Sequence, residues 1–392
     1  MHSYADRLGT EPSTVVQPTT QEEIAAIVGE ADGAGQTVIP WGGGTGQDYG
    51  YPPHRADVLL DLSRFNRILA HEPGDLTITV QAGATLADVQ AVLAEKNQFL
   101  PLDPPYAMQA TVGGIIATNA FGPSRVGYGS VRDWLIGLTV IDAGGRPIKG
   151  GGKVVKNVTG YDLPKLHVGA LGTLGVVVEA TFKVAPKPET TRALLFRLTR
   201  ADDETIGTLL STLGSRRVAP SLSLLHEADD SQRHLFVSWS GQGEAVDGEC
   251  EAAAALCRDL GLSAPFPLDS DFAVAEPEQG AASILLQVPP ADAWRTHCAT
   301  ASLNLGVSLQ TLAPIGSLEV FCPNISTART LLNWATKTSA VISAVHAPLA
   351  LRAEDQIALW HPLPPAFPLM KGLKETLDPN GTLNPGRFVG RL

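Results

Sequence analysis

Short blocks of apolar residues along the first half of the chain switch between a helical and a strand period. Residues 24–28 place isoleucine and valine at the spacing of one helix face. Thr20 and Glu23 precede this face as a capping box, a pair that satisfies backbone N–H groups at a helix start. The pattern therefore predicts a helix that begins after Thr20 and ends near Gly33.

Other blocks alternate every two residues or form short apolar runs, as strands do. Thr85 and Asp88 form a second capping box before a helix over residues 86–93, and Cys250–Leu260 has a helical pattern. This mixture of strands and helices predicts an α+β fold. The predicted strands are Thr37–Ile39, Val58–Leu62, Leu76–Gln81, Trp134–Asp142, Arg146–Lys149, Val176–Val184, Leu194–Leu198 and Leu235–Ser238.

Proline-rich segments divide the chain. Lys183–Pro188 (KVAPKP) has the composition of a linker, and His361–Pro368 (HPLPPAFP) reads as a loop. After the first of these segments glycine becomes rarer, and strands mix with Ala- and Leu-rich helices. We expect a first domain over residues 1–188, a smaller α+β domain over 189–370 and a C-terminal tail over 371–392.

The stretch Val38–Gly46 (VIPWGGGTG) carries the strongest local signal. Gly42, Gly43 and Gly44 have no Cβ, so the backbone can adopt positive φ and approach a ligand closely. Successive N–H groups in such a loop form an anion-binding nest, and the Thr45 hydroxyl adds a donor. The loop therefore indicates a diphosphate site, although a tight turn after a strand also explains it.

Further glycine clusters follow, and 24 of the 39 glycines fall between Gly33 and Gly175. No GK[ST] follows the first loop, so it is not a P-loop. Counted from Gly42, the third glycine of a GxGxxG pattern falls on Gln47. The GxxGxxG run that starts at Gly169 precedes a strand, whereas a Rossmann turn opens a helix. The pattern disfavours a nicotinamide-binding Rossmann domain and suggests an extended cofactor held along its length.

Composition narrows the class of partner. The formal net charge is −11 and there is no basic run, which argues against nucleic acid. The four cysteines form no CxxC pair, so no disulfide framework or protein-ligated metal cluster is indicated. Because no secretory signal or membrane-spanning run is evident, we expect a cytoplasmic protein that meets a membrane only indirectly, through a partner.

Five segments together resemble a known family. The chain is similar to the FAD-binding subunits of glycolate oxidase (glycolate dehydrogenase), which are FAD-linked oxidases with a flavin domain of the vanillyl-alcohol-oxidase (PCMH) type. The resemblance implies a flavin domain of two subdomains, followed by a smaller cap domain. The segments are WGGGTG at 41–46, PLDPPYAMQATVGGIIATNAFGPSRVGYGSVRD at 101–133, GGKVVKNVTGYDL at 151–163, GTLGVVVEATFKVAPKP at 172–188 and LDPNGTLNPGRF at 377–388.

The resemblance also implies which residues bind FAD. The first loop would wrap the diphosphate, Val177 would bind the adenine end through its backbone, and Asn384 would fold back near the flavin. Covalently linked relatives use a histidine in the first loop, which this chain lacks, so non-covalent attachment is expected. The implied set is Gly42, Gly43, Gly44, Thr45, Gly46, Pro105, Thr111, Gly113, Gly114, Thr118, Asn119, Gly122, Gly129, Ser130, Val177 and Asn384.

Several other polar residues have structural as well as functional interpretations. Arg132 with Asp133 is interpreted as an ion pair that braces a loop. Lys156, Asn157 and Tyr161 would contact flavin, substrate or a partner, or would serve only a turn.

The residues of a catalytic centre are not evident. Catalytic relatives that oxidise 2-hydroxy acids carry paired metal-binding histidines and an HxGDGN segment, which we do not find here. His346 and His361 are isolated in the sequence, and Arg352 with Glu354 and Asp355 is interpreted as a solvated charged turn. No catalytic residue or metal ligand is therefore assigned.

The resemblance implies an FAD-dependent 2-hydroxyacid oxidoreductase subunit. It would work with a catalytic FAD-linked subunit and an iron–sulfur subunit to oxidise glycolate to glyoxylate. One alternative is a stand-alone dehydrogenase of another small 2-hydroxy acid or alcohol. Another is a flavin-binding scaffold subunit with no chemistry of its own.

Overall fold

The structure is a computed structural model. It describes residues 4–152, 162–198, 201–215, 220, 222–228, 232–268 and 281–392. The chain divides into two compact units, which we call the first and the second unit. The first unit comprises Met1–Phe121, Ser130–Lys187 and Pro348–Leu392, and the second comprises Gly122–Gly129 and Pro188–Ala347.

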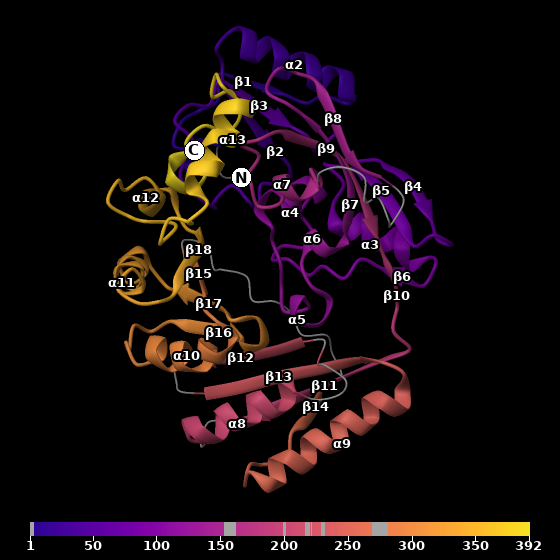
Figure 1. Ribbon diagram of the computed structural model, residues 1–392, viewed down its shortest axis with the longest axis vertical. Coiled ribbons are helices and arrows are strands. Elements are labelled where there is room, and N and C mark those ends of the chain that lie inside the picture. Colours follow the sequence, from indigo (N-terminus) through magenta and orange to yellow (C-terminus); the bar gives the residue numbers. More distant parts are fainter. Residues whose placement is uncertain are drawn as a thin grey trace. The chain divides into compact units, whose positions relative to one another are not determined.

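The first unit contains a parallel three-stranded sheet, an antiparallel five-stranded sheet and a two-stranded pair (Figure 1). The first sheet has the order β1-β3-β2 and consists of β1 (Thr14–Val16), β3 (Val58–Asp61) and β2 (Val38–Trp41). The second has the order β4-β5-β9-β7-β8 and consists of β4 (Ile68–Glu72), β5 (Thr77–Gln81), β9 (Val176–Lys183), β7 (Leu135–Ile141) and β8 (Pro147–Gly151). The pair is β6 (Gln98–Phe99) with β10 (Ala185–Pro186).

Helices cover these sheets. Thr20 caps α2 (Gln21–Gly33) with the predicted reciprocal bonds, since Glu23 N donates to Thr20 Oγ1 and Thr20 N donates to Glu23 Oε2, each at 3.2 Å. Thr85 caps α3 (Leu86–Ala94), and its Oγ1 accepts from Asp88 N. The remaining helices are α1 (Tyr4–Leu8), α4 (Val112–Thr118), α6 (Val131–Trp134), α7 (Pro164–His167), α12 (Leu349–Arg352), α13 (Phe367–Leu377) and the 3-10 turn η3 (Val389–Arg391).

The alternation of side chains in β3 builds two cores. Val58 and Leu60 face a large cluster that also contains Ile24 of α2 and Ile78 of β5. Leu59 faces the opposite side of the sheet, in a small cluster with Leu8, Ile39 and Ala56. Because the central strand β3 is buried on both faces, it reads as a continuous apolar run in the sequence.

The C-terminal tail is bound to the edge of β2. Val38 pairs with Leu383 in a parallel bridge: Val38 N donates to Thr382 O at 2.7 Å and Asn384 N donates to Val38 O at 3.1 Å. Lys374 of α13 adds a second attachment, because its buried ammonium donates to Thr173 O at 2.8 Å and Leu383 O at 2.9 Å. Both attachments place the tail beside the glycine loop that follows β2.

The second unit is one antiparallel eight-stranded sheet with helices packed along it (Figure 1). Its order is β14 (Phe266–Leu268), β11 (Thr190–Arg197), β13 (Gln232–Gly241), β12 (Leu222–Ala228), β16 (Ser308–Leu312), β17 (Ser317–Cys322), β15 (Ala282–Gln287) and β18 (Val341–His346). The helices are α5 (Arg125–Tyr128), α8 (Asp203–Gly214), α9 (Gly243–Asp259), α10 (Ala293–Ala301) and α11 (Ile325–Ala335), with the 3-10 turns η1 (Pro290–Asp292) and η2 (Ala313–Ile315). Trp239 of β13 is fully buried among residues of β11, α8 and α9.

The α+β fold class is confirmed, with differences in detail. The run Thr111–Phe121, which the sequence analysis assigns to no element, contains helix α4. The predicted loop His361–Pro368 ends earlier than expected, because α13 begins at Phe367. Pro368 is tolerated there, since the missing N–H at a first helical turn has no partner to lose.

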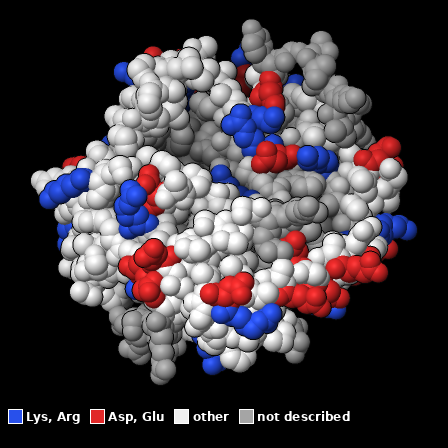
Figure 2. All heavy atoms as spheres, turned by 60° about the horizontal axis from the view of Figure 1, so that its bottom comes forward, with Lys and Arg blue, Asp and Glu red and all other residues white. Residues whose placement is uncertain are grey.

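No helix in the described part of the chain is long and apolar enough to cross a membrane. On the face shown in Figure 2, acidic and basic side chains are interspersed among uncharged ones.

His167, the last residue of α7, predicts a pH-dependent stability. It is only 8% exposed, and burial lowers its pKa to about 4. The unfolded chain therefore binds more protons than the folded chain between about pH 6.5 and 4, so acid favours unfolding in this window. We expect the free energy of unfolding to fall by about 2 kcal/mol between about pH 7.5 and 4.5 through this residue. Urea unfolding of wild type and His167→Gln measures it.

The variant should lose that part of the pH dependence, whereas His71→Gln, at a half-buried surface site, should keep it. Equal pH slopes for wild type and His167→Gln would contradict the assignment.

Candidate cofactor site

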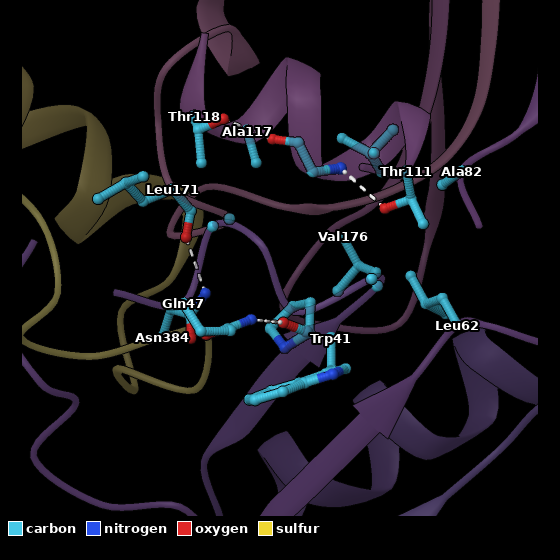
Figure 3. A pocket seen from close by; sticks show the side chains of 18 of the residues that line it. Trp41, Gln47, Leu62, Ala82, Thr111, Ala117, Thr118, Leu171, Val176 and Asn384 are labelled. Carbon is cyan, nitrogen blue, oxygen red and sulfur yellow. Dashed lines mark hydrogen bonds between the residues drawn. The ribbon is translucent and has the colours of Figure 1, made fainter. Parts of the chain in front are cut away.

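A cavity of about 690 Å³, open to solvent, lies in the first unit between its two main sheets (Figure 3). Its walls come from β2 and the loop after it, the ends of β3 and β5, helix α4, the segment that enters β9, and the tail. The lining residues are Pro40, Trp41, Gly42, Gly43, Gly44, Thr45, Gly46, Gln47, Leu62, Ala82, Thr111, Gly113, Gly114, Ala117, Thr118, Leu171, Gly172, Gly175, Val176, Val177, Asn384 and Arg387.

The glycine loop requires glycine because another backbone lies against it. A Cβ on Gly43 would lie 1.9 Å from the carbonyl oxygen of Gln109, and one on Gly42 would lie 2.2 Å from Thr111 Oγ1. Gly44 has φ of +78°, which favours glycine. Within the described part of the chain, the amides of residues 42–46 donate no hydrogen bond. The loop therefore offers a row of unused donors along the cavity wall, as an anion nest does.

Helix α4 forms a second part of the wall and packs against the glycine loop. Thr111 caps it and accepts from Gly114 N at 3.4 Å, and Thr118 Oγ1 donates to Gly114 O at 2.8 Å. A Cβ on Gly113 would lie 2.9 Å from the Ala82 Cβ, so glycine allows the helix to approach the end of β5. The helix presents backbone and small side chains to the cavity, while Figure 3 shows Trp41 and Leu62 on the other side.

The tail closes one end of the cavity. Asn384 has positive φ (44°), and its Nδ2 donates to Leu171 O at 2.7 Å, which fixes the amide orientation. Its Oδ1 is buried and has no hydrogen-bond partner among the described residues. The buried Nε of Arg387, on the same tail, also lacks one. A buried polar atom without a partner is costly, so both atoms suit a ligand that supplies the missing bonds.

The cavity thus combines two chemical regions. Unused backbone donors and an arginine suit a diphosphate, and the apolar walls formed by Trp41, Leu62, Val176 and Val177 suit aromatic rings. This donor set fits a dinucleotide cofactor.

Eleven of the sixteen predicted cofactor residues line this cavity, and five do not. Asn119 follows Thr118 directly as the left-handed cap of α4, but it does not line the cavity. Gly122 and Gly129 belong to the second unit, and Pro105 is not part of the wall. Ser130 is held in a capping box, because its N and Oγ both donate to Asp133 Oδ2. The eleven are Gly42, Gly43, Gly44, Thr45, Gly46, Thr111, Gly113, Gly114, Thr118, Val177 and Asn384.

The other sequence interpretations have mixed outcomes. The solvated turn predicted at Arg352–Asp355 is wrong for Arg352, whose guanidinium is fully buried and donates to backbone carbonyls of the first unit. Asp133 has a capping role, whereas Lys156, Asn157 and Tyr161 lie outside the described residues. In the described part of the chain, no group of three His, Cys, Asp or Glu residues is arranged to hold a metal ion.

Several wall residues were missed in the sequence. Trp41 and Gln47 flank the predicted loop, and Gly172 and Gly175 lie in a glycine cluster that was noted without a role. Leu62 and Ala82 end predicted strands, a position that carries a weak signal for a site. Arg387 stands three residues after Asn384 in the same NPGR segment, which is the signal that would have found it.

Comparison with known proteins identifies the type of domain that contributes to the cavity. A family model described as an FAD binding domain matches residues 12–151. The solved structure of p-cresol methylhydroxylase (PCMH) with substrate bound aligns with a TM-score of 0.75, at 17% identity, over 95% of this chain and 88% of that chain. Residues 12–151 are an FAD-binding domain. The chain shares the PCMH-type fold, and the cofactor of this domain is FAD.

Named relatives of this FAD-binding chain include two subunits of glycolate oxidase. Subunit GlcD of Bacillus subtilis is 31% identical over 71% of this chain and 63% of its own length. Subunit GlcE of Escherichia coli is 41% identical over 34% of this chain and 39% of its own length. A D-lactate dehydrogenase of Archaeoglobus fulgidus is 28% identical over 97% of this chain and 92% of its own length. The chain thus spans less than two thirds of either glycolate oxidase subunit.

The close packing at Gly43 predicts a sharp effect of one methyl group. Gly43→Ala places Cβ against the Gln109 carbonyl, so the loop must shift and its donors move. We expect FAD affinity to fall by about tenfold or more and the free energy of unfolding by about 1–3 kcal/mol. Flavin fluorescence titration and urea unfolding measure the two effects.

Gly33→Ala is the matched control, because its added Cβ meets no atom within 4 Å. Unchanged FAD affinity in Gly43→Ala would show that the loop does not contact the cofactor.

Proposed function

We propose that the chain is the FAD-binding subunit of a glycolate dehydrogenase (glycolate oxidase) complex. The complex would oxidise glycolate to glyoxylate and pass electrons to an iron–sulfur subunit. The observation that carries the proposal is the cavity of the FAD-binding domain, which combines a row of unused loop amides with an apolar wall. Likeness to two glycolate oxidase subunits supports the substrate and the assembly.

In this proposal the chain's residues bind and orient the cofactor. Gly42–Gly46 hold the diphosphate through backbone N–H groups, and Thr111, Gly114 and Thr118 flank the ribityl chain and the flavin. Asn384 contributes its unused Oδ1 from the tail. FAD, when bound, supplies the two-electron redox chemistry. The protein excludes water along the apolar wall and fixes the cofactor's position.

Attachment is proposed to be non-covalent, since residues 42–47 contain no histidine. The complex is proposed to lie in the cytoplasm and to meet a membrane only through partner subunits. The names of two relatives as subunits support a multi-subunit assembly. The proposed partners in it are a catalytic FAD-linked subunit and an iron–sulfur subunit.

A second candidate is a stand-alone dehydrogenase for D-lactate or another small 2-hydroxy acid. The nearly full-length alignment with a D-lactate dehydrogenase favours it.

Anaerobic reduction of the bound flavin separates the candidates. We expect glycolate to leave the flavin of the purified chain oxidised, and to bleach it at least about tenfold faster after the partner subunits are added. Absorbance at the flavin band measures this. Rapid bleaching of the chain alone by glycolate would contradict the subunit assignment.

D-lactate separates the second candidate in the same assay. Rapid bleaching of the chain alone by D-lactate, without partner subunits, would support a stand-alone dehydrogenase, and an unchanged flavin spectrum would count against it.

A further inference from the structure

Three arginines and one aspartate form a cluster behind the glycine loop, which we call the arginine cluster: Arg7, Asp48, Arg352 and Arg387. They come from α1, the loop itself, α12 and the tail, all in the first unit. Arg352 and Arg387 are 0% and 2% exposed, which is rare for cations in proteins. Asp48 Oδ2 lies 3.5 Å from Arg7 Nη1, and Asp48 Oδ1 lies 3.4 Å from Arg352 Nη2.

The cluster binds the carbonyl side of the loop. Arg387 Nη2 donates to Gln47 O and Tyr49 O, each at 3.0 Å, and its Nη1 donates to the Gln47 side-chain oxygen. Arg352 Nη1 donates to Gly50 O at 3.3 Å, and Arg7 Nη1 donates to Gly44 O. The arginines therefore donate hydrogen bonds to backbone carbonyls of residues 44–50. The amides of residues 42–46 remain unused.

Arg387 differs from its neighbours because it also lines the cavity. Its two terminal nitrogens are held by Gln47 and Tyr49, so the guanidinium plane is fixed. Its Nε is buried and has no acceptor among the described residues. Gln47 is held in turn, since its Nε2 donates to Pro40 O at 3.1 Å. Arg387 is therefore a fixed cation at the cavity wall, and its Nε–H is available to a ligand.

The positive charge of Arg387 is only partly compensated by its surroundings. The pKa of the Arg387 guanidinium is lowered to about 9, first by burial and then by the charge of Arg352, while Asp48 acts in the opposite direction. The pKa of Arg352 is lowered to about 10, mainly by burial. Both groups stay charged at neutral pH, so a nearby anion stabilises them.

We propose that Arg387 binds the diphosphate of FAD through its Nε–H and that Arg352 supplies a second buried charge behind it. The inference rests on the FAD site of the proposed function and is independent of the substrate. The diphosphate is favoured over the flavin ring because Arg387 is tied to Gln47, the residue that directly follows the row of unused amides. Charge-assisted hydrogen bonds of this kind are about twice as strong as neutral ones.

The test compares ligands with and without the diphosphate, in the absence of any substrate. FAD and riboflavin are titrated into apoprotein of wild type, Arg387→Gln, Arg387→Lys and the control Arg391→Gln. Arg391 lies on the same tail but does not line the cavity. We expect Arg387→Gln to weaken FAD binding by about tenfold or more and riboflavin binding by less than about threefold. Arg387→Lys should lie between wild type and Arg387→Gln, and Arg391→Gln should match wild type.

Equal losses for FAD and riboflavin would overturn the proposal, because they indicate that Arg387 only holds the loop. Unchanged FAD affinity would overturn it as well.

Inorganic pyrophosphate provides a measurement that needs no variant to fold. At millimolar concentration it should raise the Tm of wild-type apoprotein and compete with FAD, because a ligand that binds only the folded state stabilises it. Failure to do either would overturn the proposal. Since no glycolate is present, a failure here leaves the proposed reaction standing, and a failed glycolate test leaves this inference standing.

Discussion

The attachment of the C-terminal tail to β2 is the constraint on which the cavity depends. Thr382–Asn384 adds to the free edge of β2 through two backbone hydrogen bonds, and Lys374 ties the same tail to Thr173 O. Burial lowers the pKa of Lys374, while Asp378 raises it and accepts its hydrogen bond. The contacts with β2 join residues more than 300 positions apart, and Lys374 and Thr173 are 201 positions apart. The wall of the site therefore forms only when both ends of the first unit are folded.

Much of the fold follows from local pattern. The capping box at Thr20 and the apolar run at Val58–Leu62 appear as α2 and β3, because hydrogen bonding at a helix start and burial on both sheet faces leave direct marks in the sequence. Helix α4 was not predicted, since Gly113 and Gly114 at its start weaken the helical signal. Its need for glycine comes from tertiary packing against Ala82, which no local pattern encodes.

The residues of the site likewise fall into those that a local motif predicts and those that only tertiary packing explains. The glycine loop and Asn384 could be found because each belongs to a short motif. Arg352 could not: its place among charged residues suggested solvent, whereas the structure buries it against Gly50 O and Arg7 O. The burial of a charge depends on which distant carbonyls surround it. For the same reason, the sequence does not indicate that Arg387 lines the site, although Arg387 stands in the same NPGR segment as Asn384.

The decisive measurement for the cofactor site is the flavin content of the purified chain. Its visible spectrum is recorded before and after acid precipitation, and the flavin released into the supernatant is identified. We expect flavin bands that pass fully into the supernatant as FAD, because a diphosphate-binding loop without a histidine holds FAD non-covalently. Release of FMN alone, flavin retained in the pellet, or a colourless chain that does not bind added FAD would contradict it.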